Sequence, residues 1–275
     1  MIRALDIPGR SSTSATRLPA SVLEAKALRW HRAQRWIVDG IDIEVHSGEI
    51  VGLLGPNGAG KTVTMSIIAG LLEPTSGRVC IDGTDLTGMP LHQRARMGLG
   101  YLPQERSIFG RMNARDNVAA ILETRGLGRR SARDQANQLL ERFHLSHLAE
   151  SRAVRLSGGE QRRLEIARSL ASDPRFLLFD EPFAGIDPMT IEDLHGALVE
   201  LRRSGVGILI TDHNVRETLA LCDRAYVLFA GRVLCAGTPA ELISNPEVRR
   251  HFLGDSFELV DEPADHPMMI PTSRA

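Results

Sequence analysis

The stretch Gly55-Pro-Asn-Gly-Ala-Gly-Lys61-Thr62 decides the fold of this chain. It fits the pattern G-x-x-x-x-G-K-[ST], whose glycines let the backbone bend closely around phosphate groups. The apolar segment 49–54 before it predicts a fully buried parallel strand, and a helix is predicted from about Gly60 to Leu72. Because the motif lies between a strand and a helix, the sequence predicts an α/β fold that binds a phosphate-bearing ligand.

The residues of this loop have distinct predicted roles. Amide groups at the start of the helix are expected to face the anion, Lys61 to reach the β- and γ-phosphates, and the Thr62 hydroxyl to bind Mg²⁺. A glycine turn followed by an amphipathic helix is the alternative, and it does not require the complete motif. The predicted nucleotide-binding residues of the loop are Gly55, Pro56, Asn57, Gly58, Ala59, Gly60, Lys61, Thr62 and Val63.

A second motif places two carboxylates, Asp180 and Glu181, directly after the apolar strand predicted at 176–179. Asp180 is in a position to hold Mg²⁺, directly or through water. Glu181 is the candidate general base that orients and polarises the attacking water. A strand that ends in an acidic turn is common by itself, but downstream of a phosphate loop the pair indicates a catalytic site.

A third motif, Leu156-Ser-Gly-Gly-Glu-Gln161, precedes a helix. Ser157 is expected to cap that helix and to donate to phosphate, so Ser157, Gly158, Gly159 and Glu160 form a second candidate anion site. By spacing alone, an ordinary capped helix explains the motif equally well. One nucleotide does not obviously need both helix ends.

The order of predicted elements defines the fold class. Strands and helices alternate at both ends of the chain, which predicts a mainly parallel sheet with helices on both faces. The predicted elements include a strand at 41–45 and a hairpin at 225–235 around Ala230-Gly231. The middle, from about 110 to 172, is predicted to be helical and forms a lobe inserted into the α/β core.

The composition restricts the class of protein further. The 275 residues include 33 Lys and Arg against 34 Asp and Glu, so the net charge of −1 argues against a protein that binds the nucleic-acid backbone directly. No apolar run reaches the roughly 18 residues that span a bilayer, and the N-terminus has no apolar signal segment. Residues 1–21 and 258–275 lack periodicity and are predicted to be disordered tails.

The three motifs in this order resemble the nucleotide-binding subunits of ABC transporters, over about residues 22–257. The resemblance implies a P-loop NTPase core with an N-terminal antiparallel β region and a helical subdomain at about 106–172. It also implies an Mg²⁺-dependent ATPase that works as a homodimer. Ser157 of one copy would then close over ATP that is held by the phosphate loop of the other.

The resemblance assigns roles to further positions. Gln104 matches a glutamine that contacts Mg²⁺ and water, His213 matches a histidine that contacts the γ-phosphate, and Asp187 lies in a loop that crosses the dimer interface. The family usually has a tyrosine that stacks on adenine, and this chain departs from that pattern near Arg32. The candidates for stacking on the base are Trp30, His31, Arg32 and Trp36.

Several stretches, among them Leu102–Phe109 and Phe252–Asp255, resemble the ATPase subunits of lipopolysaccharide export systems more specifically. The resemblance implies a cytoplasmic protein, peripheral on the inner membrane, that touches the membrane only through two permease subunits docked at Ile108 and Phe109. The alternatives are the ATPase of a branched-chain amino-acid importer and a soluble ABC-type ATPase outside transport. The single nucleotide-binding domain and the absence of a basic excess argue against the last.

Overall fold

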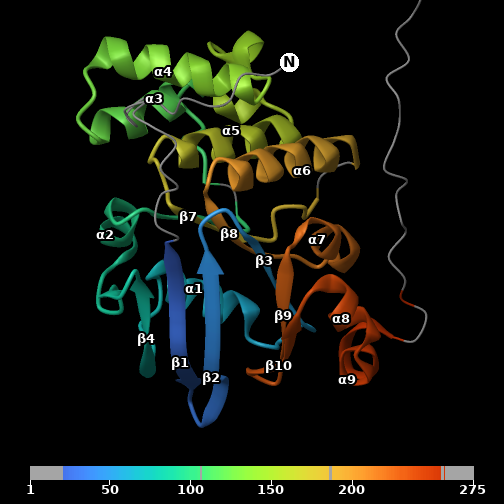
Figure 1. Cartoon of the computed structure of the whole chain (residues 1–275). Coiled ribbons are helices and arrows are strands. Elements are labelled where there is room, and N and C mark those ends of the chain that lie inside the picture. Colours follow the sequence, from blue (N-terminus) through green and yellow to red (C-terminus); the bar gives the residue numbers. More distant parts are fainter. Residues whose placement is uncertain (1–20, 106, 186–187, 255–256, 258–275) are drawn as a thin grey trace, which may run out of the picture.

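The computed structural model describes residues 21–105, 107–185, 188–254 and 257. They form two sheets and a helical lobe, and the lobe lies above the sheets in the view of Figure 1. The predicted α/β core with an antiparallel β region and an inserted helical block is therefore confirmed. The tails predicted at 1–21 and 258–275 lie, apart from Ser21, outside the described residues.

The smaller sheet is antiparallel, with the strand order β2-β1-β4-β5. Its strands are β1 (Val22–Arg32), β2 (Arg35–His46), β4 (Ser76–Ile81) and β5 (Thr84–Asp85). The strand predicted at 41–45 is the second half of β2. We did not predict β1, because register shifts after Ala25 and a positive φ of 49° at Ala27 break its two-residue periodicity.

The larger sheet has the order β10-β9-β3-β8-β7-β6. Its pairs are parallel except for the hairpin of β9 and β10. The strands are β3 (Ile50–Leu54), β6 (Leu99–Leu102), β7 (Phe176–Asp180), β8 (Gly207–Thr211), β9 (Arg224–Phe229) and β10 (Arg232–Gly237). Because β3, β7 and β8 are adjacent and parallel, the loops that follow them leave the sheet at one edge, which is where ligands bind in such sheets.

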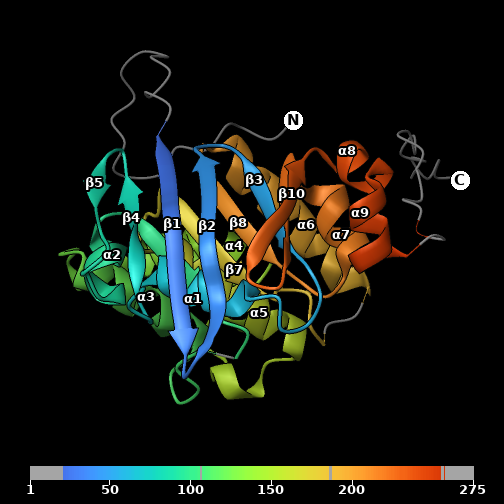
Figure 2. The ribbon, with the colours of Figure 1, turned by 90° about the horizontal axis from the view of Figure 1, so that it is seen from below.

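Helix α1 (Lys61–Ala69) lies between the two sheets (Figure 2). Its Met65, Ile67 and Ile68 are fully buried in one apolar cluster with residues of both sheets. The helix ends earlier than the predicted Leu72, because Gly70 adopts a φ of 83° and its amide bonds back to the Ile67 carbonyl. The burial of α1 fixes the direction in which the phosphate loop faces.

The helical lobe contains α3 (Ala114–Thr124), α4 (Arg129–Arg142) and α5 (Gly158–Leu170), with short 3₁₀ turns at Ser146–Leu148 and Ala153–Arg155. The remaining helices are α2 (Leu91–Arg96), α6 (Pro188–Arg203), α7 (Val215–Leu221), α8 (Pro239–Ser244), α9 (Pro246–Val248) and a π-helical turn at Arg249–Leu253. Within the described ranges, no helix combines the length and apolar character needed to cross a bilayer.

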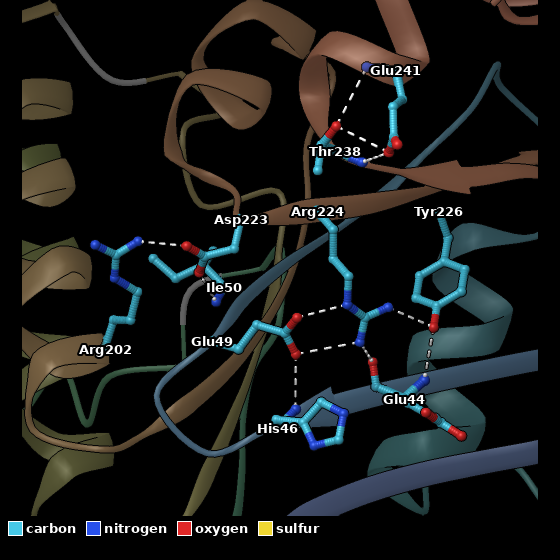
Figure 3. Close-up of polar contacts among 10 residues, drawn as sticks. All are labelled: Glu44, His46, Glu49, Ile50, Arg202, Asp223, Arg224, Tyr226, Thr238 and Glu241. Carbon is cyan, nitrogen blue, oxygen red and sulfur yellow. Dashed lines mark hydrogen bonds and ion pairs between the residues drawn. The ribbon is translucent and has the colours of Figure 1, made fainter.

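Polar contacts fix the start of β3, the strand that delivers the phosphate loop (Figure 3). Arg224 donates through Nε to Oε1 of Glu49 at 2.6 Å and through Nη1 to the Tyr226 hydroxyl at 2.7 Å. The amide of Ile50 donates to Oδ2 of Asp223 at 2.9 Å. These contacts join the first residues of β3 and β9, and the partly buried Glu49–Arg224 pair holds both strands in register.

Candidate nucleotide and catalytic site

The phosphate loop is shaped by glycine conformations and ends at a free helix tip. Gly60 has a φ of 106°, and a Cβ atom there would lie 2.6 Å from the Ile37 carbonyl oxygen, so no other residue fits. Gly58 has a φ of 79° and faces open space. Gly60 makes no side-chain cap for α1, so the first amides of α1 remain available to an anion, as the motif predicts.

Lys61 lies inside the loop rather than in solvent. Its Nζ donates to the carbonyl oxygens of Gly55 at 2.6 Å and Pro56 at 3.1 Å. Burial lowers the pKa of Lys61, and the carboxylates of Glu181 and Asp180 oppose that shift. The lysine is therefore a partly desolvated cation beside two carboxylates, a suitable position for phosphate binding.

Asp180 lies at the end of β7 and is only 1% exposed. Its Oδ2 accepts a 3.3 Å hydrogen bond from the Tyr101 hydroxyl, whereas Oδ1 has no hydrogen-bond partner among the described residues. Burial raises the pKa of Asp180. A buried carboxylate oxygen without a partner is costly unless a cation satisfies it, so this residue fits the predicted Mg²⁺ ligand. Tyr101 was not predicted, because nothing in the sequence links it to Asp180.

Glu181 is held by the two other residues predicted to be catalytic. Its Oε2 accepts from Nε2 of Gln104 at 2.6 Å, and its Oε1 lies 2.7 Å from Nε2 of His213. The glutamate is 8% exposed and has a φ of 51°, a strained conformation for a residue with a side chain. Its amide donates to the Thr211 carbonyl at 2.7 Å, which fixes the turn after β7 against β8.

Asp212 is a site residue that sequence reasoning missed. Its Oδ2 accepts from the Phe183 amide and its Oδ1 from the Asn214 amide, both at 2.8 Å. The buried carboxylate thus joins the turn that carries Glu181 to the loop that carries His213. The available signal was its position: it follows the buried strand β8 directly, much as Glu181 follows β7.

The second helix tip belongs to α5. Ser157 and Glu160 form a reciprocal capping box, in which the Ser157 amide donates to Oε2 of Glu160 at 2.7 Å and Ser157 Oγ accepts from the Glu160 amide at 3.3 Å. The Ser157 amide lowers the pKa of Glu160. The capping that we predicted for Ser157 is present, and its exposed hydroxyl remains able to donate a hydrogen bond.

A cavity of about 340 Å³ surrounds the phosphate loop and is lined in part by Lys61, Thr62, Glu181 and His213. The tip of α5 is not among the described residues that line it. Residues of β2, namely Arg35 and Ile37, also line it.

None of the four candidates for stacking on adenine lines this cavity within the described part of the chain. Trp36 lies between Arg35 and Ile37, where the pairing of β2 with β1 is irregular. Trp36 instead packs edge-on against His31, with a centroid distance of 5.1 Å, and beside the Arg29 guanidinium. Arg35 lines the cavity and carries a planar cationic group.

The two residues predicted to contact a permease differ in exposure. Phe109 is 45% exposed, and the Arg168 guanidinium lies 4.9 Å from its ring centroid. Ile108 is half-buried against the larger apolar core. Asp187, predicted to cross a dimer interface, lies outside the described residues.

The geometry is that of a nucleotide-binding ATPase, and the chain belongs to the ABC transporter family, whose pattern matches residues 38–184. Over 240 residues it is 50% identical to the lipopolysaccharide export system ATP-binding protein LptB of Escherichia coli (strain K12). That alignment covers 87% of this chain and 100% of the relative. ATP hydrolysis is the general activity of this family, and this chain is an ATP-binding subunit of that type.

Solved structures of ATP-binding cassettes have the same fold. The ADP conformation of MJ1267, an ATP-binding cassette of an ABC transporter, gives a TM-score of 0.77 at 26% identity and covers 86% of this chain and 99% of that one. A dimeric post-hydrolysis state of the cassette MJ0796, bound to ADP and Pi, gives a TM-score of 0.71 at 25% identity. It covers 79% of this chain and 98% of that one.

Proposed function

We propose that two copies of this chain hydrolyse ATP with Mg²⁺ and thereby power lipopolysaccharide export through two permease subunits. The observation that supports ATP hydrolysis is the position of Glu181 between Gln104 and His213, next to Lys61 of the phosphate loop. Support for the transported substrate comes from the relative in Escherichia coli, the ATP-binding protein of a lipopolysaccharide export system.

The residues divide the chemistry among them. Glu181 accepts a proton from the attacking water at a carboxylate oxygen, while Gln104 and His213 fix the orientation of that carboxylate. Lys61 and the amides at the start of α1 bind the β- and γ-phosphates. Thr62, Asp180 and Gln104 would hold Mg²⁺, which supplies positive charge against the charge that develops on the phosphoryl group.

The lining of the cavity supports the proposed homodimer. The cavity at Lys61 lacks the tip of α5 among its described lining residues, although Ser157, Gly158 and Gly159 offer a second set of phosphate donors. A second copy, arranged head to tail, brings its Ser157 over the ATP held at Lys61. Asp187 is proposed to lie in the same interface.

Cross-linking tests this arrangement. Asn57 and Ser157 are both exposed, so Asn57→Cys and Ser157→Cys can be joined by a short bifunctional reagent, in a Cys235→Ser background that removes the partly exposed native thiol. With Glu181→Gln to retain ATP, we expect cross-links between chains that depend on ATP. Cross-links that form equally with and without ATP, or none at all, would contradict the head-to-tail dimer.

The substrate is tested separately, at the membrane. The subunit is proposed to sit on the cytoplasmic face of the inner membrane, with Phe109 and Ile108 against the permease. We expect the Glu181→Gln variant to co-purify with two permease subunits and with lipid A-bearing lipopolysaccharide detectable by mass spectrometry. Recovery of permeases for branched-chain amino acids would instead favour an importer ATPase. Recovery of no membrane subunit would favour a soluble ABC-type ATPase outside transport.

A further inference from the structure

The loop from Pro103 to Phe109 joins the core to the helical lobe, and it carries both Gln104 and Phe109. It begins where β6 ends, at Leu102. The side chain of Gln104 contacts Glu181 in the core, yet the described backbone of the loop is bonded to the lobe. Its position therefore depends on groups that the catalytic mechanism does not otherwise use.

Glu165, in the middle of α5, makes the central contact with this loop. The carboxylate is 1% exposed, and its Oε1 accepts from the Ser107 amide at 2.5 Å and from the Ser107 hydroxyl at 3.3 Å. Its Oε2 accepts from Nη1 of Arg162 at 2.9 Å, and the same Nη1 donates to the Pro103 carbonyl at 3.3 Å. One buried anion thus binds the loop directly and orients a cation that binds it a second time.

Two further side chains complete the attachment. Arg168, one turn further along α5, donates to the carbonyl and hydroxyl oxygens of Ser107, each at 2.6 Å. Asn117 of α3 is fully buried, accepts from the Phe109 amide at 2.8 Å and donates to the Phe109 carbonyl at 3.1 Å. The loop is therefore fastened to α5 and α3 at Pro103, Ser107 and Phe109.

From these contacts we infer that Glu165 is a positioning residue, which fastens the loop to α5 and so places Gln104 on Glu181. The inference rests on the proposed function in assuming that Gln104 assists ATP turnover. Its carboxylate is the only anion among the side chains just described, and charge-assisted hydrogen bonds to a buried anion are the strongest of such contacts. Ser157 caps the same helix, α5. Glu165 therefore connects the loop, with its residues Gln104 and Phe109, to the helix whose first turn carries Ser157.

Glu165→Gln tests the inference, because it keeps the shape of the side chain but replaces one acceptor oxygen with an amide donor. We expect faster hydrogen exchange, measured by mass spectrometry on the full-length protein, in peptides covering 103–110, with no change in peptides of the phosphate loop. The expected kcat for ATP falls about tenfold, with KM changed less than about twofold. Glu141→Gln, the same charge change on an exposed part of α4, should change neither.

A double-mutant cycle separates positioning from general loss of structure. If Glu165 acts through Gln104, Glu165→Gln should cost little further activity in a Gln104→Ala background. The inference would be overturned if the losses of activity of the two substitutions multiply, or if hydrogen exchange in peptides covering 103–110 is unchanged in Glu165→Gln. Normal turnover in Gln104→Ala alone would refute the role proposed for Gln104. Hydrogen exchange in peptides covering 103–110 would then test by itself whether Glu165 holds the loop on α5.

A second variant covers the case in which Glu165→Gln does not fold. Glu165→Asp keeps the negative charge but is one methylene shorter, so it should remain paired with Arg162 and lose contact with the Ser107 amide. We expect the same local increase in exchange at 103–110 with a smaller change in the unfolding midpoint. Protection equal to that of the unmodified protein would show that the contact at Ser107 does not hold the loop.

Discussion

The side-chain amide of Gln104 donates a 2.6 Å hydrogen bond to Oε2 of Glu181. The contact joins a loop fastened to the helical lobe to the turn that follows β7 in the core. Since Nε2 of His213 lies 2.7 Å from the other carboxylate oxygen, the orientation of Glu181 depends on residues from two other segments. If Glu181 is the general base, as proposed, we expect small shifts of the helical lobe to change its orientation.

Replacing Glu181 with Gln should retain ATP binding and reduce turnover by roughly 10² to 10⁴. The amide cannot accept the proton of the attacking water, whereas the phosphate loop is unaffected. Turnover is measured by phosphate release and binding by equilibrium titration with ATP. Glu105→Gln, an equal charge change at an exposed position near Gln104, serves as the control. Full turnover in Glu181→Gln would show that another group acts as the base.

Arg35→Ala should raise the KM for ATP about fivefold while leaving kcat nearly unchanged, because Arg35 lines the cavity beside the phosphate loop and a guanidinium that stacks on a base contributes about 1 kcal/mol. Trp36→Ala is the matched control, since Trp36 is the next residue and is not among the described residues that line the cavity. The measurement is steady-state ATP hydrolysis. A larger rise in KM for Trp36→Ala than for Arg35→Ala would indicate that Trp36, and not Arg35, contacts the nucleobase.

The sequence was sufficient for the parts of the site that depend on local pattern. Lys61, Asp180, Glu181 and Ser157 lie at strand or helix ends, and spacing along the chain defines such ends directly. The bulged strand β1 was not predictable in the same way, because its periodicity is interrupted at Ala27.

Contacts across the fold could not be predicted from one sequence. The side on which Trp36 lies depends on the register of β2 with β1, and a shift of one residue would reverse it. The partners of Glu165 and of Tyr101 come from distant segments, and a lone acidic or aromatic residue in a helix or strand carries no local signal for such a contact.

Replacing Arg94 with Met should lower the free energy of unfolding by about 3 kcal/mol. Arg94 is fully buried, and its guanidinium donates to the carbonyl oxygens of Ile67, Ile68, Thr87 and Met89. Burial lowers its pKa to about 10, so the side chain remains a cation at neutral pH, at the C-terminal end of α1.

Chemical denaturation measures the effect of Arg94→Met, which removes the guanidinium donor from those carbonyl oxygens, of which the Ile67 oxygen keeps the Gly70 amide as a donor. Arg96→Met, at an exposed position of the same helix α2, should change stability by no more than about 0.5 kcal/mol. Equal effects of the two substitutions would mean that the buried contacts contribute little.

The capping box of α5 should make stability depend on pH. The Ser157 amide holds the pKa of Glu160 below its ordinary value of 4.5, so the ionised carboxylate stabilises the fold above that value. This stabilisation is lost as the pH falls through the depressed pKa of the folded state. Glu160→Gln should therefore cost about 0.5 kcal/mol at neutral pH, a modest value for a partly exposed group.

The difference between the unmodified protein and Glu160→Gln should shrink as the pH is lowered below 4.5 and through the depressed pKa of the folded state, because Glu160 then becomes protonated and neutral. Urea denaturation at a series of pH values gives the comparison. Glu241 caps α8 in the same way with Thr238, which also lowers its pKa, so Glu241→Gln should show the same direction of change. A difference for Glu160→Gln that stays constant with pH would mean that its charge does not contribute to the cap.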